Sequence, residues 1–208
     1  MERHAISTAT SLRAFVRHII HAPSTLLSIN KIYNDFKSRG ITCGKNSLHE
    51  WLDHLCDSYL TYIIPITSRS ERIRQVNPKK VYLIDTGLLT AVTANINGDK
   101  GALLENLVFI QLRRKGFLIE YYQNTKKYEV DFVVRDPING NILKLIQVTW
   151  SLENLETTKR EVRGLIAAME ELNFPEGLII TWEDRAPNLE QKNIHTLPLW
   201  RWLISSAL

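Results

Sequence analysis

Apolar residues in the first sixty positions recur at helical spacing in three successive segments. This pattern predicts helices over residues 8–20 and 27–38 and a third helix that begins at Ser47. Pro23 limits the first helix, and Gly40 ends the second. The predicted inner faces consist of Leu12, Phe15, Val16 and Ile19, then Ile29, Ile32, Tyr33 and Phe36, and then Leu48, Trp51, Leu52, Leu55, Cys56 and Tyr59.

Strand-like segments follow these helices. Residues 60–66 and 79–85 are rich in β-branched and aromatic side chains, and the basic segment 68–74 separates them. Three helices, a strand, a turn and a second strand form the order of a winged helix-turn-helix. The pattern therefore predicts a winged-helix domain over residues 1–88.

The predicted wing is the most basic part of this domain. It carries Arg69, Arg72, Arg74, Lys79 and Lys80. Only Glu71 offsets them, so these residues are candidate contacts to the phosphates of double-stranded DNA. The third helix has an outward face that includes Glu50, Asp53 and Asp57, and these acids argue against base readout. A purely structural hinge role stays open beside phosphate contact.

The second half changes from helical to strand periodicity. Residues 104–114 have the pattern of an amphipathic helix, with Glu105 beside its apolar face. Strands are predicted over residues 128–134 and 142–150, and the turn-forming segment 136–141 makes them a hairpin. By strand alternation, the side chain of Asp131 lies on the face of the first strand that is opposite its apolar residues. Gln147 and Thr149 share one face of the second strand. We expect Asp131 and Gln147 to lie close together, with Glu105 reaching in from the helix.

A glutamate on a helix, an aspartate on a strand and two residues spaced by one on the next strand resemble the core of PD-(D/E)xK nucleases. The resemblance implies catalytic positions at Glu105, Asp131, Gln147 and Thr149. It also implies a Mg²⁺ ion held by the carboxylates of Glu105 and Asp131, because this cation prefers oxygen ligands.

Two of the four positions depart from the nuclease pattern. Gln147 replaces an acid, and Thr149 replaces the lysine that positions or activates water in that family. By alternation Lys144 faces the other way, which leaves Lys159 or Arg160 on the following helix as substitutes. A nuclease-like domain with a degenerate site is therefore expected, and an active metal-dependent enzyme is the alternative, in which Glu129 is a further metal ligand.

Several motifs in one order extend the resemblance. Residues 80–88, 101–106 and 129–132 and the strand that ends at Gln147 and Val148 resemble the C-terminal half of archaeal and bacterial AAA+ ATPases with a domain of unknown function 4143. This resemblance implies a winged helix over residues 1–88, a nuclease-like domain over residues 101–208, and an ATPase domain in trans or on a longer chain. The nearest match to a phosphate-binding P-loop, residues 40–46, is one residue short and ends in Asn, so this chain is not expected to hydrolyse ATP.

The rest of the chain continues to alternate between helix and strand. We predict a helix over residues 155–173 and strands over residues 177–182 and 194–199. The fold class is accordingly α/β, or α+β overall, with a mixed sheet flanked by helices. Trp200 and Trp202 are interpreted as core or interface residues and not as a base-stacking platform.

Composition and charge indicate where the chain is located and which partners it binds. The chain has 208 residues and 44% hydrophobic side chains, and no apolar run reaches the length of a membrane span. The two cysteines show no metal-binding pattern and fit a cytoplasmic protein. Residues 1–80 carry 12 Lys and Arg against 6 Asp and Glu, and residues 81–208 carry 14 against 16, so a polyanion is expected on the first half.

Three functions remain open at this point. The first is a non-enzymatic DNA-binding or interaction module of an AAA+ ATPase. The second is a nuclease that uses Mg²⁺ bound to Glu105 and Asp131. The third is a scaffold that docks an ATPase domain without DNA. Association of the chain with itself is also open.

Overall fold

The computed structural model describes residues 9–88, 100–184, 187, 189 and 193–205. The chain divides into two compact units, Met1–Ile63 with Pro78–Gly98 and Ile64–Asn77 with Asp99–Leu208. The segment 64–77, which the pattern places in the first domain as a wing, thus groups with the second unit. The two units are described separately below.

Three helices and a small sheet form the first unit. The helices are α1 (Ala9–Ile20), α2 (Ile29–Ser38) and α3 (Lys45–Asp57), which confirms the helical periodicity. The strands β1 (Thr25–Leu27), β2 (Thr61–Ile64) and β3 (Lys79–Leu83) form a sheet in the order β1-β3-β2. Strand β1 has only three residues and no buried position, so no apolar alternation marked it in the sequence.

Burial in the first unit follows the predicted stripes except at Tyr59, which lies beyond the end of α3 and is 64% exposed. Phe15 and Ile19 of α1, Phe36 of α2 and Leu48 and Trp51 of α3 are buried. The Phe15 and Trp51 rings are 6.0 Å apart. Ser28 caps α2 by accepting a hydrogen bond from the backbone N–H of Lys31. The outward face of α3 is polar and largely exposed, as expected.

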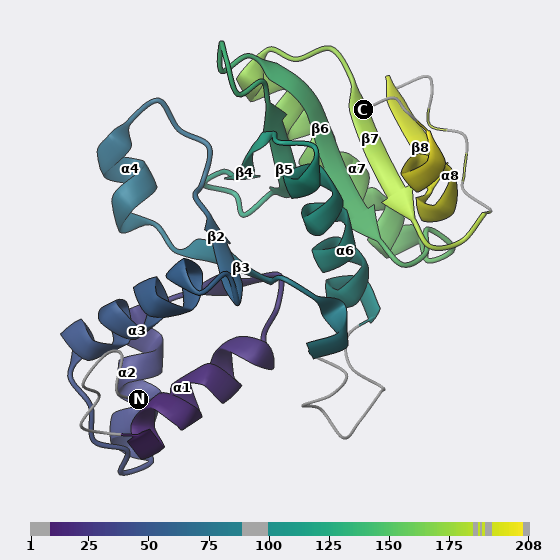
Figure 1. Cartoon of the computed structure of the whole chain (residues 1–208). Helices are drawn as coiled ribbons and strands as arrows, with labels where there is room; N and C mark the ends of the chain where they lie inside the picture. The colour runs from purple at the N-terminus through teal and green to yellow at the C-terminus, as the bar shows by residue number, and fades with distance from the viewer. Residues whose placement is uncertain (1–8, 89–99, 185–186, 188, 190–192, 206–208) are drawn as a thin grey trace. The chain divides into compact units, whose positions relative to one another are not determined.

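The second unit contains a five-stranded mixed sheet (Figure 1). Its strands are β4 (Leu118–Gln123), β5 (Glu129–Arg135), β6 (Ile142–Thr149), β7 (Gly177–Thr181) and β8 (Ile194–Pro198), in this spatial order. Strands β4, β5 and β6 are antiparallel, and β6, β7 and β8 are parallel. The predicted hairpin and mixed sheet are therefore present.

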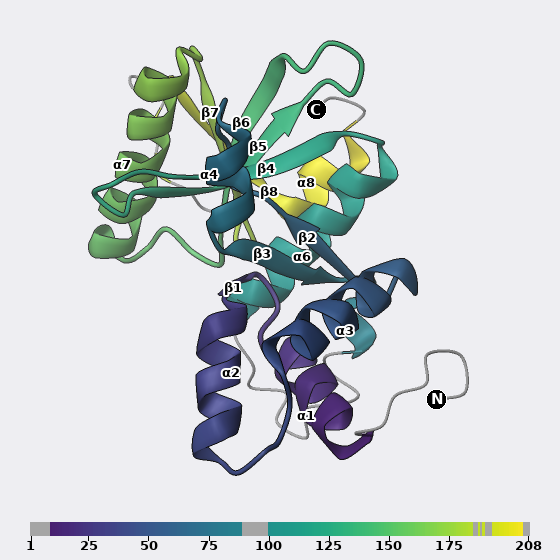
Figure 2. The ribbon, with the colours of Figure 1, turned by 90° about the vertical axis from the view of Figure 1, so that its left-hand side faces the viewer.

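Helices cover both faces of this sheet. Figure 2 shows α7 (Leu155–Leu172) on one face, and α6 (Lys100–Arg114) and α8 (Leu199–Ile204) on the other. Asn154 caps α7 by accepting hydrogen bonds from the next turn of backbone. Because both faces are covered, β5 is buried from Val130 through Val134.

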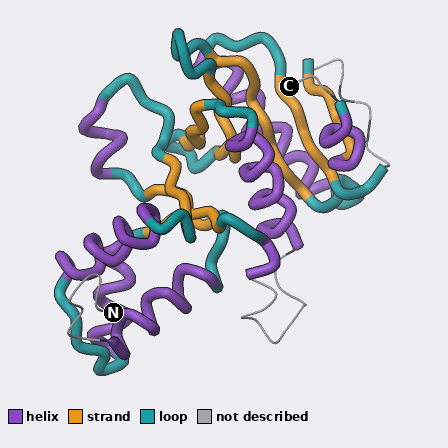
Figure 3. Tube along the Cα trace, viewed as in Figure 1, coloured by secondary structure: helices purple, strands orange, loops and turns teal. Residues whose placement is uncertain are grey.

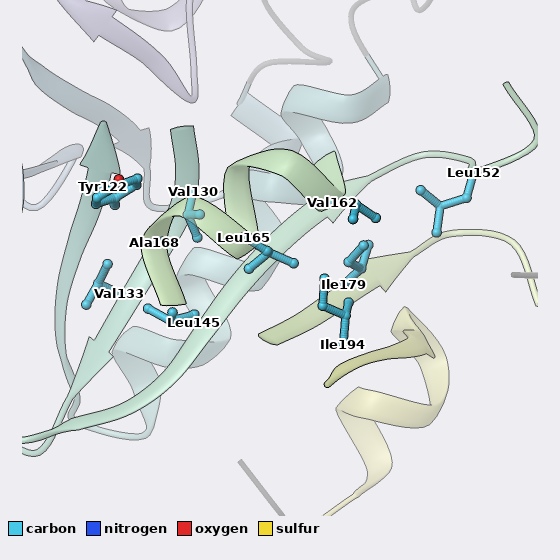
Figure 4. Close-up of a cluster of buried hydrophobic side chains, with 10 residues drawn as sticks. All are labelled: Tyr122, Val130, Val133, Leu145, Leu152, Val162, Leu165, Ala168, Ile179 and Ile194. Carbon is cyan, nitrogen blue, oxygen red and sulfur yellow. The ribbon is translucent and has the colours of Figure 1, made fainter. Parts of the chain in front are cut away.

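A cluster of buried side chains joins α7 to the sheet (Figure 4). Gly164 brings the helix close to β5, because a Cβ atom at this position would lie 2.3 Å from the carbonyl oxygen of Glu129. The cluster consists of Tyr122, Val130, Val133, Leu145, Leu152, Val162, Leu165, Ala168, Ile179 and Ile194.

The segment 64–77 lies against the edge strand β4. It contains the short helix α4 (Glu71–Val76) where the sequence predicts a turn (Figure 3). Ser70 caps α4 by accepting from the N–H of Ile73. The N–H of Thr67 donates to the carbonyl of Tyr121 at 2.6 Å, and the N–H of Tyr121 donates to the carbonyl of Pro65 at 3.0 Å. These bonds partly pair the otherwise open edge of the sheet. Within the described residues, no helix is long and apolar enough to cross a membrane.

Candidate functional site

Reciprocal hydrogen bonds join Asp131 on β5 to β6. Phe132 and Ile146 are register partners in this antiparallel pair, so Asp131, one residue before Phe132, lies opposite Gln147, one residue after Ile146. The backbone N–H of Asp131 donates to Oε1 of Gln147 at 3.2 Å. The backbone N–H of Val148 donates to Oδ2 of Asp131 at 2.9 Å. Side chains therefore satisfy the buried N–H groups just beyond the end of the strand ladder.

Gln147 extends this pair to helix α7. Its Nε2 donates to Oε2 of Glu161 at 2.6 Å, and all three side chains are buried. The orientation of the amide follows from its partners, because the N–H of Asp131 requires an oxygen and the Glu161 carboxylate accepts a donor. Gln147 thus uses both ends of its amide to connect two acids. We refer to Asp131, Gln147, Glu161 and Arg160 as the amide-bridged network.

Arg160 supplies the positive charge of this network. Its Nη2 lies 2.5 Å from Oε1 of Glu161, and its side chain is 75% exposed while that of Glu161 is 6% exposed. Burial raises the pKa of the Glu161 carboxyl, and the hydrogen bond from Arg160 opposes part of this rise. The same bond raises the pKa of Arg160, to which the charges of Asp131 and Glu129 also contribute.

At position 149, where the nuclease resemblance implies a lysine, the chain has a threonine whose hydroxyl closes a turn. Thr149 is buried, and its Oγ1 donates to the carbonyl of Ser151 at 3.3 Å. Lys144 has its Nζ 2.5 Å from Oε1 of Glu176. Lys159 is 62% exposed and pairs with Glu156. Among Lys144, Lys159 and Arg160, Arg160 is the one whose side chain binds the carboxylate of Glu161.

Glu105 lies on α6, which packs against the face of the sheet opposite α7 (Figure 2). The structure thus brings Asp131 and Gln147 together as the hairpin predicts, and it places Glu105 on the helix of the other face. Glu161 was not selected from the sequence. Its spacing of four from the buried Leu165 puts it on the inner side of α7, and a charged residue there is the signal that could have identified it.

These residues do not fit the Mg²⁺ ion that the nuclease resemblance implies. A hard divalent cation needs several oxygen ligands, and here the Gln147 oxygen accepts from Asp131 while the Asp131 carboxylate accepts from Val148. Among the residues that the structure describes, no three His, Cys, Asp or Glu side chains are grouped to hold a metal. The arrangement is suited to holding β5, β6 and α7 together.

The five predicted phosphate-contacting residues lie in different environments. Arg69 and Arg72 are exposed at the start of α4. Arg74 forms an ion pair with Glu120, a buried acid that also accepts from Nε of Arg135 at 2.8 Å. The charge of Arg74 is therefore compensated inside the second unit.

Strand β3 holds the other two basic residues. Lys79 is partly exposed, whereas Lys80 is only 2% exposed. The expectation that Lys80 contacts phosphate is therefore corrected, because a side chain this deeply buried does not present its ammonium group to a polyanion. Lys80 is instead part of the packed sheet of the first unit.

Comparisons with known proteins divide the chain near residue 100, close to the later boundary between the two units, although the first family match also covers the segment 64–77. Residues 2–100 match a family described as domain of unknown function DUF8612. The chain is 29% identical over 216 residues to the uncharacterized protein MJ1544 of Methanocaldococcus jannaschii, covering 99% of this chain and 47% of that protein. It is 24% identical over 158 residues to an uncharacterized protein of Haemophilus influenzae, covering 75% of this chain and 38% of that protein.

The chain thus spans about half or less of the length of these relatives. No solved structure matches it. Residues 100–202, which contain the whole amide-bridged network, match the family described as domain of unknown function DUF4143, and over this range the chain is consistent with that family.

Proposed function

We propose that this chain is a non-enzymatic DNA-binding module that works with an AAA+ ATPase domain in trans or on a longer chain. In this proposal the first unit is a winged helix, and the second is a nuclease-like domain whose cutting site has become structural. The observation that carries the proposal is the amide of Gln147, which bridges Asp131 and Glu161 where a nuclease has another acid.

The hydrogen bonds explain why such a site is not expected to cut DNA. Hydrolysis of a phosphodiester by this class of nuclease requires a cation held by free carboxylate oxygens and a charged group beside the attacking water. Here Asp131 binds a backbone N–H, the hydroxyl of Thr149 closes a turn, and Glu161 is neutralised by Arg160. Each group already has a structural partner.

The element order supports a winged helix. Three helices and a sheet in the order β1-β3-β2 make up the first unit, and the segment between β2 and β3 exposes Arg69 and Arg72. Acids on the outward face of α3 disfavour insertion of that helix into a groove. DNA contact is therefore assigned to phosphates, without sequence preference.

Charge reversal tests the DNA contact. The double variant Arg69→Glu and Arg72→Glu should lose the salt-dependent shift of duplex DNA that the unmodified chain shows. Lys126→Glu with Lys127→Glu is the matched control, because it changes the net charge equally at another exposed turn. Arg74 is left unchanged, since its replacement would also break the pair with Glu120. Equal binding by both double variants, or no binding by the unmodified chain, would refute the proposal.

An active nuclease is the second candidate, and one contact favours it. Arg160 lies beside Glu161 and contributes a positive charge near Asp131, as a displaced lysine would. Incubation of the chain with plasmid and either Mg²⁺ or Mn²⁺ separates the two functions. Nicking that is lost in Asp131→Asn would establish the enzyme, and intact plasmid with both metals supports the non-enzymatic module.

A further inference from the structure

Three tryptophans lie where parallel strands end. Trp150 directly follows β6, Trp182 directly follows β7, and Trp200 follows β8 after one intervening residue. Because these strands are adjacent and parallel, their carboxyl ends lie at one edge of the sheet (Figure 1). In open α/β sheets, ligands bind outside this edge. None of the three rings belongs to the amide-bridged network.

A repeated Thr-Trp sequence orients two of the rings. Thr149 and Thr181 are register partners on β6 and β7. Each hydroxyl donates to the carbonyl two residues later, Thr149 to Ser151 at 3.3 Å and Thr181 to Glu183 at 2.7 Å. The same local turn therefore follows both strands, and the two tryptophans occupy equivalent positions along the backbone.

The result is a stacked pair of indoles. The Trp150 and Trp182 ring centroids are 5.0 Å apart with an interplanar angle of 13°. The backbone N–H of Trp182 donates to the backbone carbonyl of Trp150 at 3.2 Å, and this bond links the two strand ends. Trp182 is nevertheless 52% exposed. Because Trp150 covers one face of its ring, this exposure belongs to the other face and the edges.

A lysine lies over the Trp150 ring, and a third indole with its own cation is tied to the segment that follows Trp182. Nζ of Lys100 lies 4.9 Å from the centroid of the Trp150 ring. Trp200 is 49% exposed, and its Nε1 donates to Oδ1 of Asp184 at 2.5 Å, so its ring is anchored beside the segment that carries Trp182. The guanidinium of Arg201 lies 5.3 Å from the Trp200 centroid. Flat rings are thus combined with exposed positive groups.

We propose that Trp182, supported by Trp150 and flanked by Trp200, is a stacking platform for an unpaired base of a single-stranded nucleic acid. A flat aromatic face is matched by the face of a base, which a single strand exposes and a duplex covers with neighbouring bases. Lys100 and Arg201 supply positive charge for the adjoining phosphates. The acids Glu183 and Asp184 oppose this charge, so stacking dominates and the salt dependence is shallow.

This inference goes beyond the proposed contact with duplex DNA and shares no residue with it. The test uses the full chain and a fluorescein-labelled oligo-dA of about 16 nucleotides. Trp182→Ala should weaken binding about tenfold, because stacking of a base on an aromatic side chain has this order of effect. Trp182→Phe should retain most of the affinity. Leu155→Ala is the control, since it removes an exposed apolar side chain elsewhere, one that is 73% exposed.

The outcomes separate this site from the duplex contact. Binding of oligo-dA should quench tryptophan fluorescence, and Trp182→Ala should leave duplex binding unchanged. Failure of the Arg69 and Arg72 variant to alter duplex binding would refute the proposed function without affecting this result. Equal affinity of Trp182→Ala and the unmodified chain for oligo-dA overturns the platform. The platform is also overturned if the chain does not bind oligo-dA and sedimentation shows that Trp182→Ala abolishes self-association. That result would identify the patch as a protein interface.

Discussion

The backbone N–H of Val148 donates to the carboxylate of Asp131 at 2.9 Å in a buried part of the sheet. Replacing Asp131 with Ala leaves this N–H without an acceptor, and we expect the free energy of unfolding to fall by about 1–3 kcal/mol. Asp131→Asn keeps an acceptor oxygen, so its free energy of unfolding should fall by less. Urea denaturation at constant m-value measures both losses. Identical midpoints for the two variants would contradict a structural role for this carboxylate.

Introducing an acid at position 147 should make the folded chain more stable when a divalent cation is present. Gln147→Glu removes the amide N–H that donates to Oε2 of Glu161 at 2.6 Å in the unmodified chain. Two carboxylates then face each other at this position. We expect a loss of about 3 kcal/mol at neutral pH, because a buried charge is left without its partner. Mn²⁺ should recover part of this loss in thermal unfolding. Gln147→Met, which is similar in length and uncharged, should show no response to Mn²⁺, and a response as large as that of Gln147→Glu would argue against the explanation.

Glu161 should give stability a distinct dependence on pH. Its folded pKa lies above the ordinary value of 4.5, so the folded chain binds a proton where the unfolded chain has lost it. The free energy of unfolding should therefore fall as the pH rises from 4.5 through the raised pKa. Glu161→Gln removes this titration and should give a flatter curve over that interval. Denaturation midpoints at a series of pH values test the sign, and parallel curves for the two proteins would show that Glu161 does not titrate there.

The basic segment should loosen when its buried anchor is neutralised. Glu120 has a side chain that is 6% exposed and accepts from both Arg74 and Arg135. Glu120→Gln should cost about 2 kcal/mol and speed tryptic cleavage after Arg69 and Arg72. Glu71→Gln is the matched control, because Glu71 also pairs with Arg74 but is 72% exposed. Similar cleavage rates in the two variants would mean that Glu120 does not hold the segment.

Gly164 should reverse the usual effect of alanine in a helix. Gly→Ala normally stabilises a helix interior by about 1 kcal/mol. In α7 the added Cβ would meet the carbonyl oxygen of Glu129 at 2.3 Å, and we expect Gly164→Ala to destabilise by about 1–3 kcal/mol instead. Ala167→Gly, on the partly exposed side of the same helix, should show only the ordinary cost of glycine. Stabilisation by Gly164→Ala would show that α7 can move away from β5.

Much of the second unit follows from local patterns. Alternation and the turn at residues 136–141 were enough to place Asp131 opposite Gln147, because a hairpin fixes the register between its strands. The long-range partners were harder to obtain. Glu161 reaches Gln147 because the connection from β6 to β7 lays α7 across that face, and a sequence pattern does not give the rotation of a helix against a sheet.

Two further features show what local patterns miss. The helix α4 is six residues long, too short for a clear apolar period, and its Arg74 pairs with Glu120, which is distant in the sequence. The Trp150 and Trp182 stack combines residues that follow different strands. The sequence signal for this stack is the Thr-Trp pair repeated at the ends of two apolar strands. The closely spaced Trp200 and Trp202 are instead one exposed and one buried ring.

The chain leaves the first unit after Ile63 and returns to it at Pro78, so the second unit is assembled from two separate stretches of sequence. A fragment that starts near residue 100 would lack the backbone that bonds to Tyr121 and the arginine that pairs with Glu120. Its outermost strand would then be open to pairing with other molecules. Dissection of this protein by truncation therefore calls for a fragment that carries residues 64–77 on a short linker ahead of residue 100.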